Sequence, residues 1–474
     1  MDTFRYRRSS SGVAAWAGVL LIATGVVAGQ EQQAEPQAQE VQARTLDAPG
    51  PETKEAAVEP APAPPPPETR TPEAYNIWTA KRLTGDWGGV RTDLEDFGLR
   101  ISPLLATMSQ INFRGGLNTH NAHETGGKAF WNVELDFEKM FGLKGATFFA
   151  RGIQTWNSGI GADVGSLTPP YFSAGSSGDT EFELDKWWWR QRLFDDRLEF
   201  RLGKLLNFSD LFDKNVYADN YVGKFMNRAL NQNMTFPATK GIGAFVRVWP
   251  TDWLYLQAMA VDPDTINTHN RHGTGGFDTA FHGPAHFRGF WEFGVKPELL
   301  LPAGSWLPGN YRFGWWYDPK SKTVFRDDLG GLLAERTRSQ DMGFYTSFDQ
   351  VVWTESGNPN DKQGLGIFGR YGYAHGDVNR VEHFWSAGTA YRGLIPTRDA
   401  DVLAFGVAQS ILSDDYRREV NPLADRETVY ELYYAIQVAP WLVISPDVQV
   451  ITNPGGNQDA RDAWVGGVRF KFVF

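Results

Sequence analysis

Apolar and polar residues alternate along most of the chain that follows Ile77. The stretch 463–474 shows the pattern most clearly, because Trp464 and three phenylalanines occupy one set of alternate positions and Arg469 and Lys471 occupy the other. Successive side chains of a β-strand point to opposite faces, so this stretch has an apolar face and a charged face. Strands of membrane barrels turn the apolar face to lipid and the polar face to a wet lumen. An amphipathic strand of a soluble β-sandwich is the alternative interpretation.

The same alternation predicts about sixteen antiparallel strands. The strands are expected to begin near Leu99, Phe130, Ala146, Phe182, Leu198, Gly241, Trp253, Phe287, Tyr311, Phe344, Leu365, Phe384, Val402, Thr428, Leu442 and Ala463. In the strand near Thr428, Tyr430 and Leu432 lie on one side and Glu427 and Glu431 on the other. We therefore expect an all-β fold, a transmembrane antiparallel β-barrel that occupies residues 77–474.

The first 76 residues differ in composition from the rest of the chain. Residues 1–28 have a basic head with Arg5, Arg7 and Arg8, an apolar segment and small residues at 26–28, which predicts a secretory signal peptide. A retained membrane anchor is the alternative. Residues 29–76 are rich in Gln, Glu, Ala and Pro, so we expect a disordered periplasmic segment that cannot form a packed core.

Composition narrows the functional classes. The chain has no cysteine, which excludes disulfides and thiolate chemistry, and its aromatic content of 14% suits the interfacial girdles of a barrel. Its formal net charge of −10 argues against a nucleic-acid partner. No residue pattern calls for a cofactor.

Several short blocks occur in a characteristic order. They are LTGDWGGVR at 83–91, RLFDDRL at 192–198, RLGK at 201–204, PTDWL at 250–254, Arg398 with Asp401, Glu431 with Tyr433, PDVQ at 446–449 and NPGG at 453–456. On these blocks the chain resembles the carbohydrate-selective porin family, the OprB-like outer-membrane porins, over roughly residues 80–474. The resemblance implies passive diffusion of sugars across the outer membrane. It also implies that outer-membrane lipid and, through the strand ending at Phe474, the barrel assembly machinery are partners.

The predicted lumen faces carry charges of both signs, which indicates a water-filled interior because a dry core would impose a desolvation cost on each charge. The resemblance implies a constriction built from arginine, glutamate and aromatic residues. We expect the permeant to bind Arg151 as leading donor, Glu183 as leading acceptor and Trp187 or Trp189 as a flat stacking surface, with Glu134 and Arg201 nearby. Each could instead belong to a structural ladder of ion pairs.

No catalytic constellation stands out in the sequence. Glu134 and Asp136 are a carboxylate pair of the kind that glycosidases use, but such pairs recur on most inward faces, so we expect no enzyme. The leading hypothesis is a sugar-permeable outer-membrane porin. The alternatives are an outer-membrane enzyme or adhesin on the same barrel, and a secreted all-β carbohydrate-binding protein.

Two segments nearly repeat each other. Residues 118–127 read NTHNAHETGG and residues 267–276 read NTHNRHGTGG, with eight of ten positions identical. Both are expected in extracellular loops, where His120, His123, His269 and His272 could bind a divalent metal, since neutral imidazole suits zinc, copper or nickel. The alternative is a repeated polar turn with solvated histidines.

Overall fold

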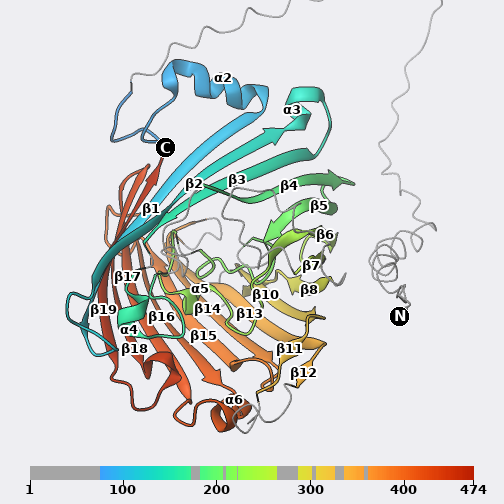
Figure 1. Ribbon diagram of the computed structural model, residues 1–474. Coiled ribbons are helices and arrows are strands. Elements are labelled where there is room, and N and C mark those ends of the chain that lie inside the picture. Colours follow the sequence, from blue (N-terminus) through green and yellow to red (C-terminus); the bar gives the residue numbers. More distant parts are fainter. Residues whose placement is uncertain are drawn as a thin grey trace, which may run out of the picture. The chain divides into compact units, whose positions relative to one another are not determined.

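The computed structural model describes residues 75–157, 159–171, 182–206, 210–220, 222–263, 287–300, 306–325, 336–356 and 361–474. Tyr75–Phe474 is one compact unit. Within it, strands form a closed antiparallel β-barrel of sixteen strands, which confirms the predicted fold class (Figure 1). None of the helices in the described ranges is long and apolar enough to cross a membrane.

The barrel strands pair with their neighbours in chain order. They are β1 (Leu99–Arg114), β2 (His123–Asp136), β3 (Ala146–Trp156), β4 (Glu183–Leu193), β5 (Leu198–Leu206), β6 (Lys240–Thr251), β7 (Leu254–Val261), β8 (Arg288–Val295), β10 (Trp306–Asp318), β13 (Asp341–Thr354), β14 (Gly364–Ala374), β15 (Val381–Arg392), β16 (Val402–Leu412), β17 (Arg426–Ala439), β18 (Leu442–Thr452) and β19 (Ala463–Val473). The short β9 (Glu298–Leu300) extends the β8 side of the ladder along β10. The last strand, β19, pairs with β1, and Leu104 lies opposite Val473, so no edge is left open.

The two faces of the wall follow the predicted alternation. On β17, Tyr430 and Leu432 are 40% and 48% exposed, whereas Glu427 and Glu431 are buried. On β19, Arg469 is fully buried toward the interior and Trp464 is partly exposed on the outside. The apolar face therefore turns outward and the charged face inward, as a barrel in lipid requires.

Most strands begin within a few residues of the predicted positions, but two begin earlier. Strand β2 begins at His123 rather than near Phe130, and β10 begins at Trp306 rather than near Tyr311. Residues 123–127 lack apolar alternation, yet they pair with Thr107–Ile111 of β1. Backbone pairing with an existing strand, rather than side-chain pattern, therefore extends β2. As a result, half of the first near-repeat lies in a strand and not in a loop.

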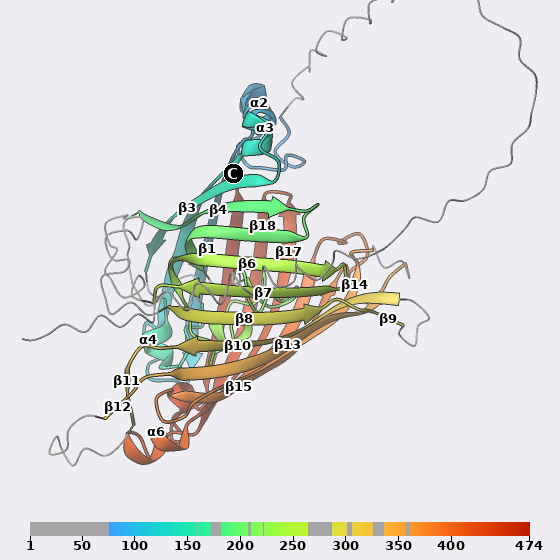
Figure 2. The same ribbon diagram turned by 90° about the vertical axis from the view of Figure 1, so that its right-hand side faces the viewer.

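The connections at the two ends of the barrel differ. At one end they are short, as at 194–197, 252–253 and 440–441. The other end carries the long connections and most of the small elements, α4 (Gly161–Val164), α6 (Asp414–Glu419), η4 (Pro454–Gly456) and the hairpin β11 (Lys322–Thr323) with β12 (Thr337–Arg338) (Figure 2). Short turns face the periplasm in bacterial barrels, which assigns the short-turn end to that side. That end also carries η1 (Trp87–Gly89), α2 (Val90–Phe97) and α3 (Phe137–Phe141).

Part of the connection between β5 and β6 folds into the barrel. We call its described residues, 210–220 and 222–239, the inward segment; it contains α5 (Arg228–Asn231), which lies inside the ring of strands (Figure 1). Phe225 and Leu230 of this segment are fully buried in one cluster with the inward faces of β14–β19. Phe212 and Phe236 join a second cluster with β6 and β8. The inward segment therefore narrows the lumen at mid-height.

Candidate functional site

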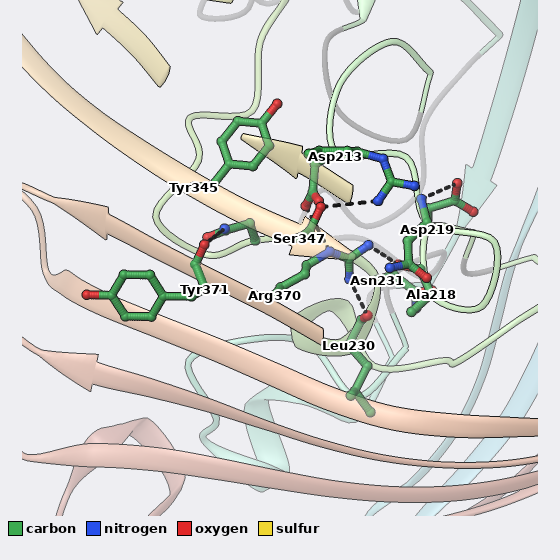
Figure 3. A network of polar contacts seen from close by, with 12 residues as sticks. Asp213, Ala218, Asp219, Leu230, Asn231, Tyr345, Ser347, Arg370 and Tyr371 are labelled. Carbon is green, nitrogen blue, oxygen red and sulfur yellow. Dashed lines mark hydrogen bonds and ion pairs between the residues drawn. The ribbon is translucent and has the colours of Figure 1, made fainter. Parts of the chain in front are cut away.

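A buried arginine of β14 holds the inward segment to the barrel wall. The guanidinium of Arg370 donates to the carbonyl oxygen of Leu230 at 2.9 Å and to that of Ala218. Its Nε lies 2.8 Å from Asp213 Oδ2, a contact that is an ion pair without hydrogen-bond alignment. Figure 3 shows Arg370 between these partners. One side chain thus binds three points that are spread along the segment.

Carboxylates of the wall bind the same segment through its backbone. Glu431 of β17 accepts hydrogen bonds from the amides of Met226 at 2.6 Å and Asn227 at 2.9 Å. Glu292 of β8 accepts from the amide of Asp213 at 2.8 Å. Because acceptors on β8 and β17 hold two different parts of the segment, its position across the lumen is set by the barrel wall rather than by local turns.

Across the lumen, β3, β4 and β6 bring four charged side chains into one chain of contacts. Arg151 Nε donates to Asp185 Oδ2 at 2.7 Å, and Lys240 Nζ bridges Asp185 Oδ1 at 2.9 Å and Glu183 Oε1 at 2.7 Å. The side chains of Arg151, Glu183 and Lys240 keep about a fifth of their surface exposed, at 18%, 21% and 24%. We call these four residues the charged cluster. Ion pairs hold all four in place, and three of them keep part of their surface exposed, whereas Asp185 is buried.

A bulge in the sheet explains this arrangement. The register between β3 and β4 shifts, so that Arg151 lies opposite Lys186 while Gly152 lies opposite Leu184, and Asp185 is the extra residue. Bulges re-aim side chains at functional positions of sheets. Here the bulge buries Asp185 and Lys186 side by side, and Lys186 forms an ion pair with Asp210 of the inward segment. The segment therefore contacts this wall as well.

Of the three consecutive tryptophans of β4, Trp188 lies on the inner face. Its ring stacks on Phe149 with centroids 5.0 Å apart, and the guanidinium of Arg201 lies 4.5 Å above it. Alternation places Trp187 and Trp189 on the opposite, outer face, where Trp189 pairs with the exposed Leu202. This orientation contradicts the sequence prediction of Trp187 or Trp189 as a stacking surface in the lumen, because both rings lie on the outer face. Trp188 faces inward but is only 8% exposed.

The other two predicted residues lie nearer the periplasmic end. Arg201 of β5 makes two contacts of 2.7 Å with Glu199, one from Nε and one from Nη2. Glu134 of β2 pairs instead with Arg100 of β1 at 3.2 Å. The structure therefore brings Arg151 and Glu183 together through Asp185 and Lys240, and it keeps Glu134 apart.

The predicted metal ligands are only partly within the described residues. His120 lies in the turn before β2 and its backbone is fixed by Asn118, whose Oδ1 accepts from the His120 amide at 2.9 Å. His123 is the first residue of β2, and His269 and His272 lie outside the described residues. Among the residues that the structure describes, no group of three or more metal-binding side chains comes together. The metal site stays a prediction.

Sequence pattern did not single out Asp185, Lys240, Trp188 or Arg370. A run of three tryptophans shows no alternation, and a bulge leaves no periodic signal. Lys240 is the first residue of β6, and a charged residue at the junction of a loop and a strand carries no special signal. Arg370 is one of many cations that the alternation assigns to the lumen. Most of their partners are distant in the chain: Arg151 and Asp185 are 34 residues apart, and Arg370 and Asp213 are 157 residues apart.

A closed antiparallel barrel with an apolar exterior and a charged, narrowed interior is the architecture of an outer-membrane porin. Residues 120–474 match the family model described as carbohydrate-selective porin, OprB family. The chain therefore belongs to the OprB family, and it is an outer-membrane protein.

Individual relatives agree with this assignment. The chain is 25% identical over 431 residues to Porin B of Pseudomonas aeruginosa, covering 83% of this chain and 92% of that protein. It is 24% identical over 444 residues to the putative porin QuiX of Acinetobacter baylyi, covering 85% and 95%. The high-pH structure of Pseudomonas putida OprB has the same fold, with a TM-score of 0.73, 23% identity and coverage of 85% of this chain and all of that one.

Proposed function

We propose that sugars diffuse through this porin between the inward segment and the charged cluster, and that Arg151, Glu183 and Lys240 contact them in passing. The observation that carries the proposal is the partial exposure of Arg151, Glu183 and Lys240 in a lumen that the inward segment narrows. Membership of a family of carbohydrate-selective porins supports sugars as the substrate class.

The chemistry of the charged cluster suits a neutral polyol. Arg151 and Lys240 supply N–H donors, and Glu183 supplies carboxylate acceptors, so a sugar hydroxyl can donate and accept at one place. Each charge already has a partner of opposite sign, so a neutral solute can exchange hydrogen bonds without leaving a charge unpaired. Binding of this kind is weak enough to allow release, as conduction requires.

We propose passive conduction and no catalysis. The pair that could have suggested a glycosidase supports this view, since Asp136 caps α3 by accepting from the amides of Glu138 at 3.0 Å and Lys139 at 3.2 Å. Glu134 is paired with Arg100. Both carboxylates are therefore engaged in structural contacts rather than placed about a reacting bond.

Swelling of liposomes that contain the purified protein tests the proposal. We expect the swelling rates to rank sugars above uncharged solutes of equal size that lack hydroxyl groups, and we expect added sugar to block the ion current in planar bilayers. Equal rates for all solutes of one size would reject sugar selectivity. Extraction only by detergent, with heat-modifiable migration, would exclude the secreted carbohydrate-binding alternative.

Arg151→Ala tests the charged cluster itself. We expect the sugar flux to change more than the melting temperature, because Asp185 keeps Lys240 as a partner at 2.9 Å. Arg418→Ala is the matched control, since Arg418 is 65% exposed on α6 at the long-loop end. Unchanged flux with a lower melting temperature would make Arg151 a purely structural ion-pair residue.

A further inference from the structure

Two short helices at the periplasmic end of the barrel expose large apolar side chains. On α2, Val90 and Phe97 are 52% and 56% exposed, and on α3, Phe141 is 69% exposed. Both helices lie together beyond the ends of β1 and β2 (Figures 1 and 2). A helix that faced only water would not present its largest apolar residues in this way.

The residues of α2 divide into three faces. Arg91 and Glu95 face the preceding chain, where Arg91 Nη1 donates to the carbonyl of Gly85 at 2.8 Å and Glu95 pairs with Arg82 at 2.6 Å. Thr92, Asp93 and Asp96 form a polar face. Val90, Leu94 and Phe97, spaced by four and three residues, share a third face that is apolar. Such a division is typical of a helix that lies in a membrane interface.

A line of aromatic rings connects α3 to the outer wall of the barrel. Trp189, on the outward face of β4, lies 4.8 Å from Phe137, and Phe137 lies 5.6 Å from Phe141. Lys139 Nζ donates to the carbonyl of Glu95 at 2.7 Å, which joins α3 to α2. The exposed apolar residues of the two helices are therefore an extension of the lipid-facing surface.

The chain before α2 reaches the same surface at a second place. Trp441 Nε1 donates to the carbonyl of Ile77 at 2.6 Å, and the Trp441 ring stacks on the outward-facing Phe472 with centroids 6.3 Å apart. The neighbouring Trp78 is 65% exposed. The amide of Leu83 donates to the carbonyl of Val473 at 2.8 Å, so this chain is fixed to the last strand.

We propose that Trp78, the apolar face of α2 and Phe141 of α3 form a lipid-binding platform that rests on the inner, phospholipid leaflet of the outer membrane. The continuity of the platform with the lipid-facing wall at Trp189 and at Phe472 selects phospholipid as its occupant. The platform holds the β19–β1–β2 seam at a set depth, because the chain of the platform runs directly into β1 and is hydrogen-bonded to Val473. This inference does not depend on which solute the porin conducts.

Spin labelling tests the platform directly, because the natural chain has no cysteine. Val90→Cys and Phe97→Cys each receive a nitroxide label, and the full-length porin is placed in phosphatidylethanolamine–phosphatidylglycerol vesicles. Collision rates of the label with oxygen, which concentrates in lipid, and with a water-soluble nickel chelate are then measured. Asp96→Cys on the polar face is the aqueous control, and Leu432→Cys on the outer face of β17 is the lipid control. Heat-modifiable migration of each variant verifies the folded barrel.

We expect the ratio of oxygen to nickel collisions at positions 90 and 97 to be several times that at position 96 and to approach that at position 432. Ratios at 90 and 97 equal to that at 96 would place the helix in water and overturn the proposal. Labels at 90 and 97 that neither reagent reaches would show that protein covers the face, which would also overturn it.

Discussion

Replacement of Arg370 by methionine is the sharpest test of how the lumen is narrowed. Arg370→Met removes the contacts to Asp213, to the Leu230 carbonyl and to the Ala218 carbonyl in one step. The methionine side chain keeps much of the volume of the arginine stem, so the main loss is of charge and hydrogen bonds. We expect the inward segment to loosen, the open-channel current to rise and become noisier, and sugar block to weaken.

The size of the expected destabilisation follows from the burial of the ion pair between Arg370 and Asp213. The Arg370 side chain has no exposed surface and that of Asp213 has 5%. Removing one member of a buried ion pair typically costs about 3–5 kcal/mol, because the other charge is left unpaired in a poorly solvated place. The segment stays bound by Glu431 and Glu292, so we expect partial release rather than expulsion from the barrel.

Planar-bilayer recordings and thermal unfolding in detergent measure the two consequences. Arg370→Met combined with Asp213→Asn should be less destabilised than Arg370→Met alone, since the double variant no longer buries an unpaired carboxylate. Arg418→Met is the control, because an exposed arginine of α6 should change stability by less than about 0.5 kcal/mol.

An Arg370→Met variant that conducted ions, fluctuated and bound sugar like the natural protein would refute the role of Arg370 in holding the inward segment. That role would also be refuted if the double variant were destabilised by the sum of the two single changes. In that case Arg370 and Asp213 would act independently, and the inward segment would be positioned by other contacts.

Three further outcomes are expected. Deletion of Phe474 should lower the amount of assembled barrel in the outer membrane, measured by surface labelling, if the assembly machinery reads the terminal aromatic residue. Burial disfavours the charged form of Asp401, but the hydrogen bonds from Arg398, Gln437 and Tyr434 prevail and hold its pKa below the ordinary value of 3.8. Asp401→Asn should therefore reduce stability at neutral pH, and the difference should shrink as unfolding is measured at pH values falling below about 4. Calorimetry with zinc should show heat that is lost when His120 and His269 are both changed to alanine; no heat would end the metal hypothesis.

The strand pattern could be predicted because it depends on local physics. In β17 and β19 every second residue must be compatible with lipid, so the alternation of Tyr430 with Glu431, or of Phe470 with Arg469, appears directly in the sequence. Where lipid does not select the side chains, as at residues 123–127, the pattern vanishes and the strand is set by pairing with β1.

The sequence predicts the position of a strand better than it predicts which face of that strand a single residue occupies. Three consecutive tryptophans at 187–189 suit either phase of the alternation, and the bulge at Asp185 separates them from the pattern before it. Only the register with β3 and β5 decides that Trp188 faces the lumen. The structure brings Arg151 and Glu183 into one cluster through Asp185 and Lys240, which were not foreseen, and the role of Arg151 and Glu183 in binding the permeant stays a prediction.

The sequence by itself determined that the chain forms a closed barrel in the outer membrane, because the requirement for an apolar outer face repeats in most of the strands. The tertiary structure alone decided where the lumen narrows. The inward segment has no periodic pattern of its own, and its position depends on Arg370, Glu431 and Glu292, which lie 140, 205 and 79 residues from the atoms they bind. Contacts over such separations are selected by the geometry of the closed wall, which no local pattern of residues encodes.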